Sequence, residues 1–275
     1  MGYSDKENDA GLDPFSLIYK AGQWRVNNVS PMHDLQYSAV KQKQYAAKIK
    51  QALNTETVIA SDFNVTFEQS TDLRDSKDAA PAIVIKVLSK NSGEKKCLYA
   101  GILMSWGVTR NLPLATYLPF YLDKGNSKIN QVVKKTLSTM FDCQIQQYNI
   151  NQQKLLIILF EFVEMFVSVW KSTELCYSTG GTDNVSIGFE TDDIYNILKS
   201  YDDLSDRNQQ IIATYHSLQN LIYHGNKVDI TPMNLTEFNL ANKVRIKSNG
   251  TISMKTPEAV KIIFNILNKT SNFKY

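Results

Sequence analysis

The sequence contains few of the residues that build disulfide frameworks and metal sites. Its cysteines and histidines number three each: Cys97, Cys143, Cys176, His33, His216 and His224. An odd number of widely spaced cysteines argues against a disulfide framework or a zinc site, and favours buried thiols in a reducing compartment such as the nucleus or cytosol. The histidines form no HExxH pattern, so we expect them to be structural rather than metal ligands.

Motifs of the common enzyme classes are absent as well. The sequence has no GxxxxGK[ST] phosphate loop, no GxSxG nucleophile turn and no EF-hand loop, and Gly180-Gly181 lacks a glycine partner at dinucleotide spacing. These absences favour a non-catalytic protein without a bound cofactor. The alternative that stays open is an enzyme, for example one that processes nucleic acid, whose site is assembled from residues scattered along the chain.

No apolar run is long enough to predict a membrane span. The longest, LLIILFEFVEMFVSVW, has sixteen residues, whereas a spanning helix needs about 20. Within it, Glu161, Glu164 and Ser168 have the spacing i, i+3 and i+7 and therefore share one side of a helix. We predict a core helix that is buried on its other sides. The glutamates are not expected to bind metal, because the bundle pattern adds a histidine one turn away.

The charges are segregated along the chain although the net charge is only +3. Residues 174–206 contain eight acidic residues and one lysine, whereas residues 207–275 contain nine basic and three acidic residues. Such an asymmetric field suits docking to other macromolecules, including nucleic acid. Ordinary solvated faces would give the same pattern, so both interpretations stay open.

Hydrophobic periodicity predicts a mixed α+β fold with a largely antiparallel sheet and packed helices. Helices are expected at 38–53 with Val40, Tyr45, Ile49 and Leu53 inward, at 127–141 with Ser127 as the N-cap, at 155–170 and at 257–269. Strands are expected at 63–67, 82–88 and 97–106. Residues 1–14 are predicted to be a disordered acidic tail. Residues 15–275 are predicted to form one α+β domain, with a division into two sub-domains left open, that ends in a hairpin, a helix and a strand.

The hairpin KVRIKSNGTISMK has one register that separates its faces. A three-residue loop, 248–250, pairs Ile246 with Ile252 and Val244 with Met254, and it places Gly250 at the left-handed position. The apolar residues then share one face. The other face carries four cations, which are the candidate DNA-facing residues: Lys243, Arg245, Lys247 and Lys255. Lysine and arginine at alternate positions can follow phosphates, but a solvated sheet face is the other interpretation.

The chain ends in SNFKY, where Phe273 and Tyr275 alternate as they would in a strand with one buried face. These two residues are candidates for a strand that pairs with a partner chain. Folding back onto the chain's own core is the alternative.

QWRVNNVSPM near the start of the chain is followed about thirty residues later by DFNVTF. Both stretches resemble the centromere protein L family, in which the first is similar to the entry motif. The segment LPFYLDKGNSKINQVVKKTLSTMFDCQI resembles the family's central strand, glycine-containing loop and helix. Its matching residues are Leu118, Pro119, Gly125, Phe141, Asp142 and Cys143. The final hairpin and helix complete a resemblance that extends, in scattered pieces, over most of residues 20–270.

This resemblance implies a non-catalytic subunit of the inner kinetochore in the nucleus, with a curved antiparallel sheet. It implies a heterodimer with a centromere protein N homologue, contacts to other subunits of the constitutive centromere-associated network, and a role in holding centromeric nucleosomes and DNA for chromosome segregation. It also implies that Phe141 and Cys143 pack at a helix-to-strand junction, and that a short strand after the last helix takes part in dimer contacts. The stoichiometry, and a homodimer of the isolated protein, are left open.

Overall fold

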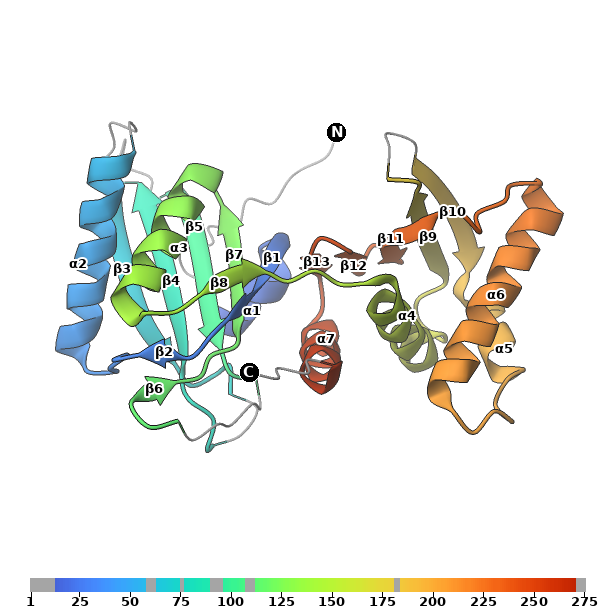
Figure 1. The fold of residues 1–275 in the computed structure, drawn as a ribbon, viewed down its shortest axis with the longest axis horizontal. Helices are drawn as coiled ribbons and strands as arrows, with labels where there is room; N and C mark the ends of the chain where they lie inside the picture. The colour runs from blue at the N-terminus through green and yellow to red at the C-terminus, as the bar shows by residue number, and fades with distance from the viewer. Residues whose placement is uncertain are drawn as a thin grey trace. The chain divides into compact units, whose positions relative to one another are not determined.

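The computed structural model describes residues 13–57, 63–74, 77–89, 96–106, 112–180 and 184–270. They form a mixed α+β structure with antiparallel strand pairing (Figure 1), as the sequence predicts. The chain divides into two compact units, Met1–Tyr148 and Asn149–Tyr275. The first twelve residues of the predicted acidic tail lie outside the described residues. Asp13 caps the first helix and Pro14 begins it.

Unit 1 is built on an open antiparallel sheet with the strand order β8-β1-β7-β5-β4-β3. The bounds are β1 Gln23–Val29, β3 Phe63–Ser70, β4 Ala82–Ser89, β5 Lys96–Met104, β7 Phe120–Gly125 and β8 Ile145–Gln147. A separate two-stranded sheet pairs β2 (Met32–His33) with β6 (Ala115–Thr116). The sheet is neither closed nor strongly curled.

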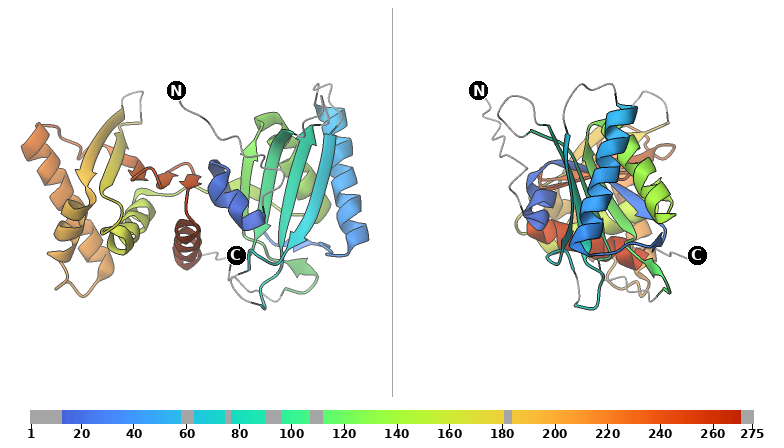
Figure 2. Two further views of the ribbon diagram at one scale, coloured as in Figure 1. Left: turned by 180° about the vertical axis from the view of Figure 1, so that it is seen from behind. Right: turned by 90° about the vertical axis from the view of Figure 1, so that its left-hand side faces the viewer.

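Helices cover both faces of this sheet. α2 (Ala39–Glu56) and α3 (Ser127–Phe141) pack on one face, and the short α1 (Pro14–Lys20) lies by β1 on the other (Figure 2). The indole of Trp24 donates to the Ile18 carbonyl of α1 at 2.9 Å, whereas Asn27, on the opposite side of the same strand, accepts from Lys134 of α3 at 2.7 Å. Successive side chains of β1 thus point to opposite faces of the sheet, and they contact helices on both faces.

The core beneath α2 and α3 differs from the prediction at two helix starts. Tyr45, Ile49 and Leu53 are buried, but Val40 is 66% exposed. Val40 stands five residues before Tyr45 and therefore lies about 140° away from the buried stripe. Ser127 is the first residue of α3 rather than its cap. The preceding Asn126 accepts from the backbone N–H groups of residues 128 and 129.

A buried carboxylate joins α3 to the centre of the unit 1 sheet. The Asp123 side chain is fully buried, and it binds Arg25 at 2.7 Å and Lys134 at 2.9 Å. The amide of Asn27 donates to the same carboxylate at 2.6 Å. A buried carboxylate is tolerated only when it is paired and hydrogen-bonded in this way, so the network fixes how β1, β7 and α3 align.

Unit 2 contains a second antiparallel arrangement, β10-β9-β11-β12-β13. The strand bounds are β9 Ser172–Ser178, β10 Asn184–Glu190, β11 Asn234–Leu240, β12 Val244–Lys247 and β13 Thr251–Met254. The helix bounds are α4 Gln152–Phe166, α5 Thr191–Lys199, α6 Arg207–Asn226 and α7 Pro257–Thr270. α4 packs against β11, α5 against β10 and α7 against β13, so helices cover the apolar side of the strands.

The apolar run found in the sequence forms α4, a core helix. Across the part of the chain that the structure describes, no helix is both long and apolar enough to cross a membrane. Glu161, Glu164 and Ser168 lie on the wetter side as predicted, but Met165 and Val169 are also exposed, at 54% and 68%. The helix ends at Phe166 rather than at the predicted residue 170. Val169 therefore lies in the turn that follows and not on the predicted face of the helix.

Candidate nucleic-acid interface

The β12–β13 hairpin has the predicted register. Ile246 pairs with Ile252 and Val244 pairs with Met254, across a connection of three residues. Gly250 has a φ of 75°, which is the left-handed conformation that this loop requires. All four paired apolar side chains are fully buried. The separation into an apolar and a polar face is therefore confirmed.

The four predicted cations lie on the polar side of this hairpin. Lys243, Arg245 and Lys255 are exposed, and Lys247 is half-buried. The backbone N–H of Lys255 donates to the carbonyl of Lys243 at 2.9 Å, which brings these two residues together at the open end of the hairpin. Lys243 and Lys255 thus meet at the open end of the hairpin, and Arg245 and Lys247 follow on β12.

A carboxylate that the sequence reasoning missed lies among these cations. Glu237 of β11 pairs with Arg245, and its second oxygen is 3.0 Å from the ammonium of Lys247. Its side chain is only 10% exposed. In the described part of the chain, Lys243 and Lys255 have no acidic partner. Four cations and one carboxylate leave this surface positive, but two of the cations are already engaged.

The pairing of β11 with β12 explains why Glu237 was missed. Lys247 stands directly opposite Glu237 in the register, and Arg245 stands opposite Asn239. The alternation in NLTEFNL, which places Glu237 and Asn239 on one side of a strand, was the available signal. Using it required knowing that this strand pairs with the hairpin.

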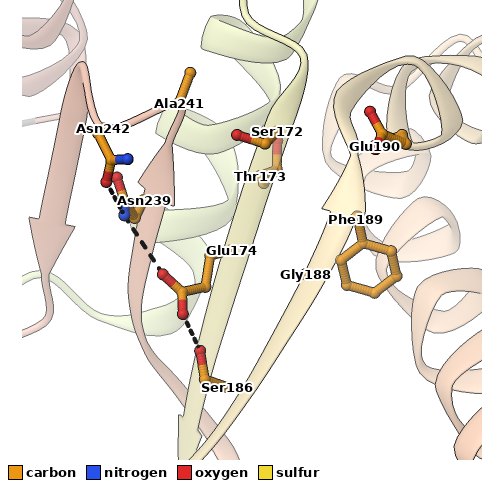
Figure 3. Close-up of a pocket in the computed structure, with 10 residues that line it drawn as sticks. All are labelled: Ser172, Thr173, Glu174, Ser186, Gly188, Phe189, Glu190, Asn239, Ala241 and Asn242. Atoms are coloured by element: carbon orange, nitrogen blue, oxygen red, sulfur yellow. Dashed lines mark hydrogen bonds between the residues drawn. The ribbon is translucent and has the colours of Figure 1, made fainter.

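The polar face continues into a shallow hollow on β9, β10 and β11, with a volume of about 550 Å³ (Figure 3). Glu174 lies at its centre and accepts from the Ser186 hydroxyl and from the Asn239 amide, the latter at 3.4 Å. These hydrogen bonds, with the positive charge of Arg245, lower the pKa of Glu174. The carboxylate therefore stays ionised, and the face changes sign from acidic at β9 and β10 to basic at the hairpin.

The groups that this face offers are charged side chains and hydrogen-bonding side chains. Among the residues that the structure describes, no group of three or more histidine, cysteine or acidic side chains is arranged to hold a metal ion. Cys176 lies on the same face, next to Ser186, but burial raises the pKa of its thiol. A thiol held in the neutral form is a poor nucleophile.

The other predicted partner site is the C-terminal segment SNFKY. Phe273 and Tyr275 lie outside the described residues, which end at Thr270, the last residue of α7. The partner-strand role of these two residues stays a prediction.

A family model described as CENP-L, Centromere protein L, matches residues 19–269. The chain belongs to this family. Because the match covers nearly the whole chain, it extends over both units. No curated protein matches the sequence. Members of the centromere protein L family are non-catalytic kinetochore subunits, and this confirms the prediction that the chain is not an enzyme. The chain is therefore a centromere and kinetochore protein that acts beside inner-kinetochore partners.

The residues that carried the family resemblance have packing roles in the structure. Phe141 and Cys143 are buried beneath the end of α3, and Asp142 between them adopts the left-handed conformation that ends the helix. Burial raises the pKa of the Cys143 thiol to about 11. Gly125 ends β7 where the chain passes close to β5. Phe141, Asp142 and Cys143 thus build the junction between α3 and β8, whereas Gly125 lies at the end of β7, before α3.

Proposed function

We propose that this protein is a structural subunit of the inner kinetochore that pairs with a centromere protein N homologue and helps to hold centromeric nucleosomes and DNA. The observation that carries the DNA part of the proposal is the polar face of a hairpin whose apolar face is buried, since the polar face carries Lys243, Arg245, Lys247 and Lys255. Phosphates are bound by such arrays without reading sequence. Membership of the centromere protein L family supports the setting.

Reversal of the hairpin charges tests the DNA contact. In the complex with the centromere protein N homologue, Lys243→Glu, Arg245→Glu, Lys247→Glu and Lys255→Glu together should weaken binding to duplex DNA. Each lost phosphate contact should flatten the slope of log K against log salt by about 0.9. Fluorescence anisotropy at several salt concentrations measures both quantities. An unchanged slope would assign this face to solvent.

A substitution of Glu237 is a matched control, because it should change DNA binding in the opposite direction. Glu237→Gln keeps the shape of the side chain and releases Arg245 and Lys247 from their ion pairs. If these cations contact phosphate, the Glu237→Gln complex should bind DNA about two- to tenfold more tightly at low salt. The Lys261→Glu variant, which alters an exposed lysine of α7, should leave binding near the wild-type value.

Truncation after Thr270 tests the pairing role of the last five residues. An unpaired strand offers backbone hydrogen bonds and alternate side chains to a partner chain. We expect the truncated protein to stay folded and to bind the centromere protein N homologue at least about tenfold more weakly in titration calorimetry. Loss of folding would place Phe273 and Tyr275 in the chain's own core, and normal pairing would show that they are not needed.

A further inference from the structure

Helices α2 and α3 of unit 1 carry positive charge that the hairpin proposal does not use. α2 has four lysines and α3 has three, whereas the two helices contain one acidic residue, Glu56. They lie side by side on one face of the unit 1 sheet (Figures 1 and 2). In the described ranges the exposed Lys48 and Lys128 have no acidic partner, and Lys135 pairs with Glu56 at 2.9 Å.

A groove of about 400 Å³ lies between these two helices. Its lining is more apolar than its residue types suggest. Thr55, Thr136 and Thr139 each donate their hydroxyl to the carbonyl four residues earlier in their own helix, at 3.0, 2.8 and 3.0 Å. With the hydroxyls satisfied by backbone, these threonines contribute methyl groups to the lining, together with Ala52 and Met140.

The rim of the groove is cationic, with Lys48 on the α2 side and Lys135 on the α3 side. An apolar floor between cations matches a ligand with an apolar stripe flanked by carboxylates. Duplex DNA fits this surface less well, because its phosphates would meet the lysines but leave the apolar floor unfilled. An amphipathic helix satisfies both the floor and the rim.

We propose that the groove between α2 and α3 docks an acidic amphipathic helix of a partner protein. Its apolar side chains lie against Ala52 and Met140, and a carboxylate pairs with Lys48, because Lys135 is already held by Glu56. The site goes beyond the proposed DNA and centromere protein N contacts, and it involves neither the hairpin nor the C-terminal residues. The two proposals can therefore fail separately.

A synthetic helix serves as the probe. A labelled peptide of about 18 residues, or five turns, carries leucine at i, i+3, i+4 and i+7 with glutamate at the flanking positions. Fluorescence anisotropy with the full chain should give a dissociation constant in the micromolar range. Lys48→Glu, which removes a rim charge, and Ala52→Trp, which fills the floor, should each weaken binding at least about tenfold. The same peptide with lysine in place of glutamate should not bind.

Lys43→Glu is the matched control. Lys43 is exposed on α2 but stands five residues from Lys48, about 140° around the helix, and its reversal should change binding by less than about twofold. Circular dichroism establishes that each variant is folded. The proposal is wrong if the wild-type chain does not bind the acidic peptide, or if Lys43→Glu weakens binding as much as Lys48→Glu. It is also wrong if a duplex of about 20 base pairs displaces the peptide, which would make the face a phosphate-binding surface.

Discussion

Gly125 shows how a single residue limits what the fold accepts. It ends β7 with a φ of 114°, and a Cβ atom added there would lie 2.3 Å from the carbonyl oxygen of Leu98. The obstructing atom belongs to the backbone of β5, so no side-chain rotation can relieve the contact. Gly22 also has a positive φ, of 86°, but nothing lies within 4 Å of its added Cβ.

These two glycines allow strain and collision to be separated. Gly22→Ala should cost about 1 kcal/mol, the penalty of a left-handed backbone alone. Gly125→Ala should cost about 3 kcal/mol or more, because the collision is added to the strain. Urea unfolding of both variants measures the difference. Equal costs would mean that β5 and β7 separate easily at this point.

The sequence predicts the backbone conformation of a residue only where the pattern of the surrounding strands requires it. The left-handed Gly250 follows from matching the two faces of the hairpin. By contrast, Ala241 and Asn242, in the turn between β11 and β12, have φ values of 47° and 55°. Nothing in the sequence marks Ala241 for that conformation, since alanine has no local preference for it. The turn is imposed by the strands that it joins.

In α4, the spacing of the glutamates did not reveal the ion pairs that Glu164 makes. Glu164 was predicted to be a solvated residue, but it pairs with Arg207 of α6 and lies 3.2 Å from the ammonium of Lys199 of α5. Its hydrogen bond to Lys199 is the main cause of the raised pKa of that lysine. Glu164 therefore links three helices. Glu161, one turn earlier, has no ion pair among the described residues.

A comparison of the two glutamates tests this link. Glu164→Gln should lower the free energy of unfolding by about 1 kcal/mol, since the pairs are partly exposed to solvent. Glu161→Gln should change it by less than about 0.5 kcal/mol. Chemical denaturation of both variants gives the values. Indistinguishable variants would return Glu164 to the role of a solvated residue.

For helices and strands, the sequence predicts where an element lies in the chain better than it predicts which other element packs beside it. The hairpin register and the core helix α4 follow from local periodicity, because both are decided within about fifteen residues. The ion pairs of Glu237 and Glu164 depend on which strand or helix packs alongside, and that partner is set by segments far away in the chain. The sequence therefore predicted the four cations of the candidate surface but did not predict the carboxylate of Glu237 that binds two of them.

In the molecule as a whole, buried tyrosines link stability to alkaline pH. Burial raises the pKa of Tyr37 and of Tyr215 to about 12, from an ordinary value of 10.0. It also raises the pKa values of Tyr99, Tyr121 and Tyr177 above the ordinary range. The folded chain keeps these hydroxyls protonated at a pH where the unfolded chain ionises them. Their contribution to stability is thus complete below pH 10 and is lost as the pH rises.

We therefore expect unfolding in mild alkali, with a midpoint between about pH 10 and pH 12. In one pH titration, a cooperative step in tyrosinate absorbance should coincide with the transition in circular dichroism, because these five hydroxyls ionise only when the core opens. Tyr37→Phe should move the midpoint to higher pH. A transition in circular dichroism without a coincident step in tyrosinate absorbance would contradict the burial of these hydroxyls.

Strand order is the property of the whole molecule that the sequence could not supply. The antiparallel α+β class follows from the absence of a regular βαβ rhythm. The pairing of β1 with β7, by contrast, joins segments that five strands, β2 to β6, and the helix α2 separate along the chain, and β8 follows later still. No local pattern encodes such a contact.

That pairing has a consequence for how the protein is made. Arg25 in β1 and Asp123 in β7 are 98 residues apart, so at about 5 to 20 residues per second the ribosome delivers β1 about 5 to 20 s before β7. During that interval the apolar residues Trp24, Val26 and Val29 have no strand partner. The polar residues between them interrupt the hydrophobic run, as gatekeeper residues do in strands that must wait. The sequence of β1 thus suits a nascent chain that has to stay soluble until its partner strand emerges.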